Sequence, residues 1–447
     1  MSGIAELLLT LGYRVSGSDI TMSDVTDRLE TLGGKIFNGH HADHINDVDV
    51  VVTSSAIQSE NPEVLAALEA SVPVIPRAEM LAELMRLKYS IAVAGAHGKT
   101  STTSMIASVL AEGGLDPTVV IGGKLKSINT NAVLGEGDFI VAEADESDGS
   151  FLKFSPTIAV VTNIDLEHID FYGNLENIKS VFLSFIDRIP FYGLAVLCLD
   201  NESVQEIIPQ IKKRFVTYGL TAQADIQARD VKFEGMQSRF KVFRNDACDG
   251  QVALNMPGIH NVYNSLAAIS VGFELDIPFK KIQIALEQLQ GVARRLEVKG
   301  DVAGIKVLDD YGHHPTEIKI TLDAIRKSWP GRRLIVIFQA HRFSRTKALY
   351  DEFTRSFYQS DLLIVLPVYA AGEERIEGID NVMLCDGIKS HGHKEVKHFN
   401  EMPAAVDYLA RVAKQGDIVL TLGAGDVWKA GESLIKKLDD GYYGDSI

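Results

Sequence analysis

The segment 90–110, SIAVAGAHGKTSTTSMIASVL, constrains the fold more than any other part of this chain. An apolar, strand-like run leads into a turn bracketed by glycines, and Lys99-Thr100 then opens a helix-like stretch. This is the layout of a phosphate-binding loop, in which backbone N–H groups at a helix start hold phosphate oxygens. Lys99 would reach the β- and γ-phosphates, and the Thr100 hydroxyl would bind Mg²⁺. The loop is a shortened variant, because Val93 stands where the usual pattern has its first glycine. The alternative is a glycine turn without a ligand.

Length and composition indicate a globular protein with several domains. The chain has 447 residues, of which 46% are hydrophobic and 23% are charged. The formal net charge of -16 argues against a nucleic-acid backbone as the partner. Cys198, Cys248 and Cys385 are far apart, which favours a reducing, cytoplasmic location without disulfides. We expect no membrane insertion and no signal peptide.

Helix-like and strand-like segments alternate along the whole chain. This rhythm predicts an α/β protein with three doubly wound domains in series, over 1–88, 89–293 and 294–447. The first domain is expected to contain a buried parallel strand over 48–54. The rhythm begins on a helix, although a Rossmann-like unit needs a first strand and a glycine turn before that helix. We therefore expect the first domain to lack these two parts.

Acidic residues follow two predicted strands of the central domain. Glu143 and Asp145 come directly after one strand, at the place where a Mg²⁺ ligand of a phosphate site is typical. The next strand is followed by Asn163, Asp165, His168 and Asp170. Ile164 breaks the Asn-Lys-x-Asp pattern of a guanine site, so a metal or phosphate site is the better interpretation. The alternatives are solvated acidic turns and an ordinary core or surface histidine.

Basic and aromatic residues follow two predicted strands of the third domain, in DDYGHHPTE (309–317) and FQAHRFSRT (338–346). Strand ends of this kind bind ligands in α/β sheets, and Arg342 and Arg345 suit a carboxylate. A solvated basic turn is the alternative, and His314 is expected to lie beside a helix N-cap. The GHHADHI segment (39–45) lacks a third ligand at a useful distance, so we expect no metal there.

Six motifs, in this order, resemble the Mur ligases of peptidoglycan synthesis: GAHGKTSTTS, EADESDGSF, TNIDLEHIDFYG, GIHNVYNSLAA, DDYGHHPTE and FQAHRFSRT. The resemblance covers essentially the whole chain. It implies a Rossmann-like UDP-binding domain, a central P-loop ATPase domain and a Rossmann-like amino-acid-binding domain. It further implies an ATP-dependent ligase that joins L-alanine to the carboxylate of UDP-N-acetylmuramate through an acyl phosphate.

Other functions remain open at this stage. The second candidate is a muropeptide-recycling ligase, which joins a peptide to UDP-N-acetylmuramate. A folylpolyglutamate synthase-like ligase, a P-loop motor or switch, and a pure binding module are further alternatives. The cofactors implied by the resemblance are ATP and Mg²⁺, and the protein is expected to be a monomer or homodimer.

The resemblance also implies roles for individual residues. The ATP-binding set is Gly95, Ala96, His97, Gly98, Lys99, Thr100, Ser101, Asn261, Asn264, Arg295 and Asp310. Thr100, Glu143 and His168 would bind Mg²⁺. Ser2, Asp19, Ser54 and Ser55 would contact the sugar nucleotide, and Tyr311, His313, His341, Arg342 and Arg345 would form the alanine pocket. The catalytic residues would be Lys99, His168, His313 and His341, and either of the last two could take the amine proton.

Two departures from the family pattern affect these expectations. Family members carry a strand and a Gly-x-Gly-Gly-Ile-Gly loop before MSGIAE, and this chain starts at the end of that loop. We therefore expect a weaker grip on the UDP diphosphate. Several relatives use a carbamylated lysine about fourteen residues beyond the position of His168. Phe182 stands there in this chain, so no carbamate is expected.

Overall fold

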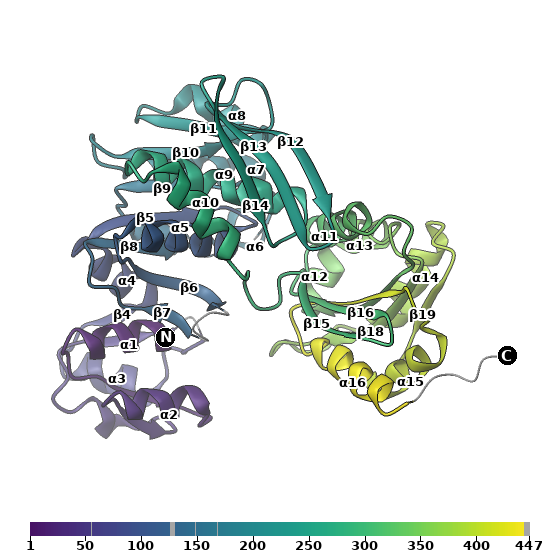
Figure 1. Cartoon of the computed structure of the whole chain (residues 1–447). Helices are drawn as coiled ribbons and strands as arrows, with labels where there is room; N and C mark the ends of the chain where they lie inside the picture. Colours follow the sequence, from purple (N-terminus) through teal and green to yellow (C-terminus); the bar gives the residue numbers. More distant parts are fainter. Residues whose placement is uncertain (55, 126–129, 148, 168, 442–447) are drawn as a thin grey trace. The chain divides into compact units, whose positions relative to one another are not determined.

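The computed structural model describes residues 1–54, 56–125, 130–147, 149–167 and 169–441 (Figure 1). Contacts within the chain divide it into two compact units. Unit 1 comprises Met1–Asp230, Phe240–Val252 and Tyr263–Leu289, and unit 2 comprises Val231–Arg239, Ala253–Val262 and Gln290–Ile447. The predicted first domain and most of the predicted central domain therefore belong to unit 1, and the predicted third domain belongs to unit 2.

The first part of unit 1 combines short helices with two small parallel sheets. Its helices are α1 (Ser2–Thr10), α2 (Asp24–Thr31), η1 (Ala42–Ile45), α3 (Pro62–Glu69) and α4 (Arg77–Arg86). One sheet pairs β1 (Ser16–Asp19) with β2 (Lys35–Asn38), and the other pairs β3 (Val51–Thr53) with β4 (Val74–Pro76). The strand expected over 48–54 is present and parallel. The prediction that it is buried is wrong, because β3 lies in a sheet of only two strands and stays half-buried.

A ten-stranded sheet carries the phosphate loop. Its strand order is β14-β13-β12-β11-β10-β9-β5-β8-β6-β7. β5 (Tyr89–Ala94) runs parallel to both neighbours, and Ile91 pairs with Val141 on one side and Ile158 on the other. The apolar run over 91–94 is fully buried, as two-sided coverage of a parallel strand requires. The other strands are β6 (Thr118–Leu125), β7 (Thr130–Val133), β8 (Phe139–Glu143), β9 (Ile158–Val161), β10 (Leu194–Cys198), β11 (Phe215–Gly219), β12 (Ile226–Glu234), β13 (Gln237–Arg244) and β14 (Ala247–Leu254).

Helices cover this sheet and complete its core. They are α5 (Lys99–Gly113), η2 (Ser150–Lys153), α6 (Ile169–Tyr172), α7 (Leu175–Asp187), α8 (Glu202–Ile207), η3 (Ile208–Gln210), α9 (Ile259–Glu274) and α10 (Phe279–Gln288). Phe182 and Phe185 of α7 are buried against Phe151, with ring centroids 5.4 and 4.9 Å from it. Phe182 is therefore a core residue.

Unit 2 is built on a six-stranded sheet with the order β15-β16-β20-β17-β18-β19. Only the pairing of β15 with β16 is antiparallel, and the remaining pairs are parallel. The strands are β15 (Glu297–Val302), β16 (Ile305–Asp310), β17 (Leu334–His341), β18 (Leu362–Tyr369), β19 (Val396–His398) and β20 (Ile418–Leu422). The helices are α11 (Pro315–Ser328), α12 (Phe343–Ala348), α13 (Tyr350–Thr354), α14 (Asn381–Ser390), α15 (Met402–Val412) and α16 (Trp428–Asp439).

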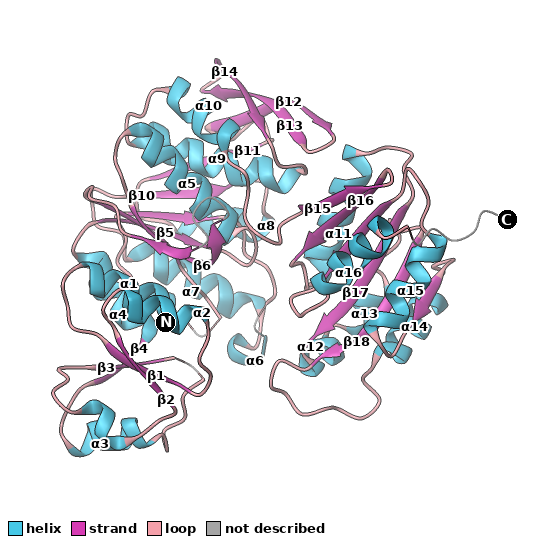
Figure 2. Ribbon diagram, turned by 60° about the horizontal axis from the view of Figure 1, so that its bottom comes forward, coloured by secondary structure: helices cyan, strands magenta, loops and turns pink. Residues whose placement is uncertain are grey.

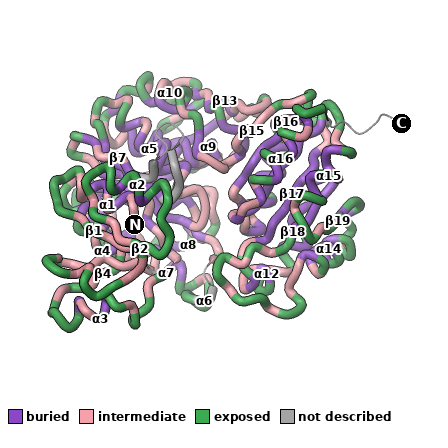
Figure 3. The backbone as a smooth tube through the Cα atoms, turned by 90° about the horizontal axis from the view of Figure 1, so that it is seen from below, coloured by how far each residue is buried: buried purple, intermediate pink, exposed green. Residues whose placement is uncertain are grey.

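Both faces of the unit 2 sheet are covered, as Figure 2 shows. Residues of α11, α13 and α14 pack with Leu308 and Phe338 in one core, and residues of α15 and α16 pack with Val307 and Ile337 in the other. The central strands are therefore buried along their length (Figure 3). This confirms the doubly wound prediction for this part of the chain. Within the described residues, no helix combines the length and apolarity that a membrane crossing requires.

Candidate active site

The phosphate loop lies between β5 and α5, as the sequence predicts. Gly95 and Gly98 have φ angles of +138° and +83°, which residues with a side chain rarely adopt. The surroundings also exclude a side chain. A Cβ atom at Gly95 would lie 2.1 Å from Oγ1 of Thr162, and one at Gly98 would lie 2.6 Å from Oδ1 of Asn264. The two glycines therefore let the loop pass close to β9 and α9.

Asn163 fixes the shape of this loop. Its Oδ1 accepts a hydrogen bond from the backbone N–H of His97 at 2.9 Å, and its Nδ2 donates to the carbonyl of His97, also at 2.9 Å. Oγ1 of Thr162 donates to the same carbonyl at 2.7 Å. The sequence placed Asn163 in a metal or phosphate cluster. In the structure its side-chain amide pairs with the loop backbone instead.

Lys99 begins α5, and its ammonium group lies within the loop. Nζ donates to the carbonyls of Gly95 and Ala96 at 2.6 and 3.2 Å and to Oε1 of Glu146 at 2.9 Å. The side chains of Lys99 and Glu146 are 15% and 4% exposed. Burial opposes the charge on Lys99, but the carboxylates of Glu146, Glu143 and Asp145 outweigh burial and raise its pKa. The sequence did not single out Glu146, whose partner is 47 residues away.

Thr100 and Glu143 are brought together as predicted. The Thr100 hydroxyl lies 3.1 and 3.0 Å from the two carboxylate oxygens of Glu143, at the carboxyl end of β8. Hydroxyl and carboxylate oxygens are the ligands that Mg²⁺ prefers, so this pair fits the implied metal. His168, the other implied ligand, lies outside the described residues.

Four more residues of the ATP set lie in the loop, in α5 or on α9: His97, Ser101, Asn261 and Asn264. Ser101 is buried in the first turn of α5. The ring of His97 lies between two carboxylates, 3.4 Å from Asp165 and 3.7 Å from Glu167. Asn264 is buried beside Gly98, whereas Asn261 donates to the Pro257 carbonyl at 2.7 Å.

The residues expected to contact the sugar nucleotide lie at the ends of helices and strands in the first part of unit 1. Ser2 begins α1, Asp19 ends β1, and Ser54 follows β3. Asp19 accepts a hydrogen bond from the backbone N–H of Thr21 at 3.0 Å. Ser55 lies outside the described residues.

Glu63 organises the GHHADHI segment. Its carboxylate lies 2.7 Å from Nδ1 of His44 and accepts hydrogen bonds from the Ser18 hydroxyl at 2.8 Å and the His41 backbone N–H at 3.3 Å. The His44 ring also stacks on Phe37, with centroids 3.9 Å apart. This histidine therefore ties η1 and β2 to α3. Glu63 was not found from the sequence, because it lies 19 residues from His44.

An aromatic cluster forms at the carboxyl ends of the unit 2 strands. The His313 ring lies edge-on to Tyr311 at 5.4 Å and 5.8 Å from His341, and His341 stacks on Tyr369 at 5.5 Å. The structure thus brings together three of the predicted alanine-pocket residues and adds Tyr369. Burial lowers the pKa of His313 to about 4, and burial also lowers that of His341. The His313 imidazole is therefore neutral at pH 7, and burial favours the neutral form of His341.

Arg342 lies at the same edge, but a carboxylate of the chain already pairs with it. Its Nε donates to Oε1 of Glu373 at 2.5 Å, and Ser344 donates to Glu373 through both its N–H and its hydroxyl. Burial opposes the charge on Glu373, but the Ser344 hydrogen bonds and the Arg342 guanidinium lower its pKa to about 2. Arg345 adds positive charge nearby and helps to lower the pKa of His341. Glu373 was missed because nothing in its local sequence marks it.

Arg295 and Asp310 also lie in unit 2. Arg295 pairs with Glu317 at 3.3 Å and lies 5.5 Å from the Tyr311 ring. Asp310 is buried and accepts hydrogen bonds from two backbone N–H groups at 2.8 Å, and burial raises its pKa to about 6. His314 was expected beside a helix N-cap, and the structure shows that it is itself the N-cap of α11.

Comparison with known proteins gives a consistent picture along the chain. Three family models match it: "Mur ligase family, catalytic domain" over residues 1–89, "Mur ligase middle domain" over 93–272, and "Mur ligase, glutamate ligase domain" over 294–425. The chain is 63% identical over 435 residues to UDP-N-acetylmuramate–L-alanine ligase of Desulfatibacillum aliphaticivorans, covering 97% of this chain and 95% of the relative. It is 57% identical over 441 residues to the enzyme of that name from Geobacter sulfurreducens, covering 98% and 96%.

Solved structures show the same likeness. The crystal structure of UDP-N-acetylmuramate–alanine ligase from Thermotoga maritima matches with a TM-score of 0.82 at 29% identity, covering 99% of this chain and 97% of that one. A murein peptide ligase from Psychrobacter arcticus matches with a TM-score of 0.69 at 25% identity, covering 100% and 97%.

Proposed function

Because the chain belongs to the Mur ligase family, we propose that it joins L-alanine to the carboxylate of UDP-N-acetylmuramate at the expense of ATP. The observation that carries this proposal is the likeness to relatives that bear this activity in their name. Those relatives are up to 63% identical along nearly the whole chain. The peptide-recycling alternative is weaker, because the murein peptide ligase shares only 25% identity and a lower TM-score.

The reaction needs an activated carboxylate, since an amide does not form from a carboxylate and an amine in water. A carboxylate oxygen of UDP-N-acetylmuramate attacks the γ-phosphorus of ATP, the bond to the β–γ bridging oxygen breaks, and ADP leaves. Lys99 is the cation of the loop and would stabilise the charge that builds up on the transferred phosphoryl group. Thr100 and Glu143 would hold Mg²⁺, which supplies further positive charge at the phosphates.

The second step forms the amide. The nitrogen of L-alanine attacks the acyl carbon, the bond from that carbon to the phosphate oxygen breaks, and inorganic phosphate leaves. The nitrogen must lose a proton, and burial favours the neutral form of both His313 and His341, which is the form that can accept one. Arg342 and Arg345 would face the carboxylate of the amino acid. A reaction that consumes ATP and a sugar nucleotide fits the cytoplasm.

Phosphate release with each acceptor added in turn tests this function. With ATP, Mg²⁺ and UDP-N-acetylmuramate present, we expect release with L-alanine and little release with a tripeptide carrying an N-terminal L-alanine. Release with the tripeptide at a higher kcat/KM than with L-alanine would contradict the proposal and favour the recycling ligase. Release that does not require UDP-N-acetylmuramate would contradict both.

A further inference from the structure

Arg294, at the start of the third predicted domain, contacts two separate segments of unit 2. Its side chain is 22% exposed, and Nε donates to Oδ2 of Asp309 at 3.0 Å. Nη1 donates to the carbonyls of Ala424 and Gly425 at 3.3 and 3.1 Å, and Nη2 donates to the carbonyl of Gly423 at 2.5 Å. One guanidinium group therefore ties the end of β16 to the loop that follows β20.

The backbone of Arg294 is equally constrained. Its φ is +59°, a left-handed conformation that costs a non-glycine residue free energy and persists only where the surroundings hold it. The N–H donates to Oε2 of Glu297 at 2.8 Å, and the carbonyl accepts from the backbone N–H of Tyr311 at 2.7 Å. The guanidinium also lies 5.0 Å from the Tyr311 ring. Arg294 thus fixes both the backbone and the ring of an expected pocket residue.

The loop that Arg294 holds supports the other side of the aromatic cluster. Gly425 packs so closely that a Cβ there would lie 2.4 Å from Oε1 of Gln339 and 2.7 Å from the Tyr369 ring. Tyr369 in turn stacks on His341, with an interplanar angle of 10°. A shift of the loop at Gly425 must therefore move Tyr369 and, through it, His341.

We propose that Arg294 is a positioning residue that sets the shape of the amino-acid pocket from both sides, through Tyr311 and through the loop at Gly425. This inference rests on the proposed function, since it takes the aromatic cluster as the place where L-alanine binds. L-alanine is small and offers few contacts, so its affinity depends closely on the placement of the groups that line the pocket. The sequence pointed to Arg295, one residue later, and did not indicate Arg294.

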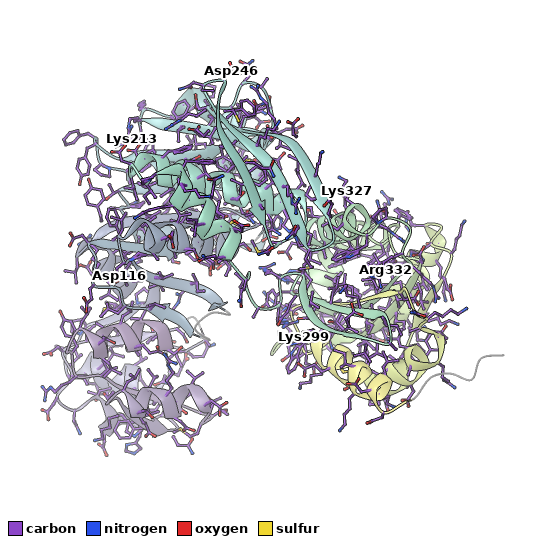
Figure 4. The ribbon with its side chains drawn as sticks, viewed as in Figure 1. Asp116, Lys213, Asp246, Lys299, Lys327 and Arg332 are labelled. Carbon is purple, nitrogen blue, oxygen red and sulfur yellow. The ribbon has the colours of Figure 1, made fainter. Side chains whose placement is uncertain are left out.

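The substitution R294K tests this role. Lysine keeps the positive charge that faces buried Asp309. Its three N–H donors are on a single nitrogen, however, so it cannot reach Asp309 and the three carbonyls of the loop after β20 at once, as the planar guanidinium group does. The matched control is R332K. Arg332, labelled in Figure 4, donates to three backbone carbonyls in the turns that precede β16 and β20, those of Gly304, Gly416 and Asp417.

We expect R294K to raise the KM for L-alanine tenfold or more while the KM for ATP changes less than twofold. R332K should leave both KM values within twofold, although both variants should lower the melting temperature by similar amounts. Equal effects of the two variants on the KM for L-alanine would overturn the proposal. So would a rise in both KM values of R294K by the same factor, which marks a purely structural role.

A second variant covers the case in which R294K fails to fold. The double variant R294Q/D309N removes the charge at 294 together with its buried partner, so no carboxylate is left without a cation. It should show the same selective rise in the KM for L-alanine, and an unchanged KM would overturn the proposal. If the unmodified protein shows no turnover that depends on L-alanine, the proposed function is contradicted. The role of Arg294 is then tested by calorimetry, which compares the affinity of the unmodified protein and of R294K for L-alanine.

Discussion

The ion pair between Lys99 and Glu146 predicts a large, separable effect on stability and activity when Lys99 is replaced by methionine. Methionine has a similar length but no charge, so the Glu146 carboxylate, 4% exposed, loses the ammonium 2.9 Å away. Removal of one partner of a buried ion pair costs about 3–5 kcal/mol. That is a large part of the roughly 5–15 kcal/mol by which a domain is normally stable.

The loss should depend on pH, with a sign that follows from Glu146. Burial already raises the pKa of this carboxyl, although Lys99 opposes the rise, so K99M should raise it further. A carboxyl whose pKa is higher in the folded than in the unfolded state binds more protons when folded. The free energy of unfolding then falls as pH rises through this range. K99M should therefore be closer to the original protein at pH 5.5 than at pH 8.

Urea unfolding of four proteins measures the effect: the original chain, K99M, E146Q and K99M/E146Q. The double variant removes both charges, so it should recover most of the stability that K99M loses at pH 8. It should not recover ligation, because the cation that would stabilise the transferred phosphoryl group is gone. We expect phosphate release to fall on the order of 10³-fold in both variants that lack Lys99.

Three results would refute this reasoning, two of them on stability and one on activity. If K99M is as stable as the original protein at pH 8, or if the double variant is less stable than K99M, the ion pair is not what holds Glu146. If K99M folds and its rate of phosphate release stays within about tenfold of the original rate, Lys99 does not contact the reacting phosphate.

Three further predictions follow from other parts of the structure. E143Q should raise the Mg²⁺ concentration needed for half-maximal turnover at least tenfold, without changing the melting temperature by more than a few degrees, and a magnesium titration that coincides with that of the original would contradict it. R345Q should raise the KM for L-alanine about tenfold or more, as expected for the loss of a charged hydrogen bond, and R342Q should raise it less, because Arg342 pairs with Glu373. Burial lowers the pKa of His260 to about 4, so its contribution to stability is present above pH 6.5 and is lost as pH falls. H260F should therefore remove about 2 kcal/mol of the stability difference between pH 7 and pH 5, and unchanged pH dependence in urea unfolding would contradict this.

Local patterns made the phosphate loop predictable. A buried strand, a turn with glycines at both ends and a helix beginning at Lys99 occupy consecutive residues, so the sequence itself fixes their order. The residues that hold this loop in shape were not predicted as such. Asn163 and Glu146 lie 66 and 47 residues from the loop residues they contact, and only the pairing of parallel strands brings them together. Both residues lie within recognisable motifs, but the sequence does not show which residues they contact.

The unit 2 cluster shows a second limit of the sequence. Polar residues after β16 and β17 were expected to meet, because parallel strands end at one edge of a sheet. This located Tyr311, His313 and His341. It could not show that Tyr369 joins them, since a tyrosine ending an apolar strand is common. It also could not show which of two adjacent arginines turns toward the loop after β20, because that depends on the left-handed backbone at Arg294.

These two limits have one physical origin, and it bears on how variants should be chosen. A residue that contacts a ligand needs a particular chemical group at a strand end or helix start, and such a placement leaves a local signal. A residue that holds it in place needs only a complementary partner, which can be any distance away in the chain. Glu146 and Arg294 belong to this second kind. Substituting Arg294 changes geometry while leaving the reactive groups present, so the split between affinity and turnover in its variants reports on placement. Substituting Glu146 also removes a carboxylate that raises the pKa of Lys99, so its variants report on charge as well.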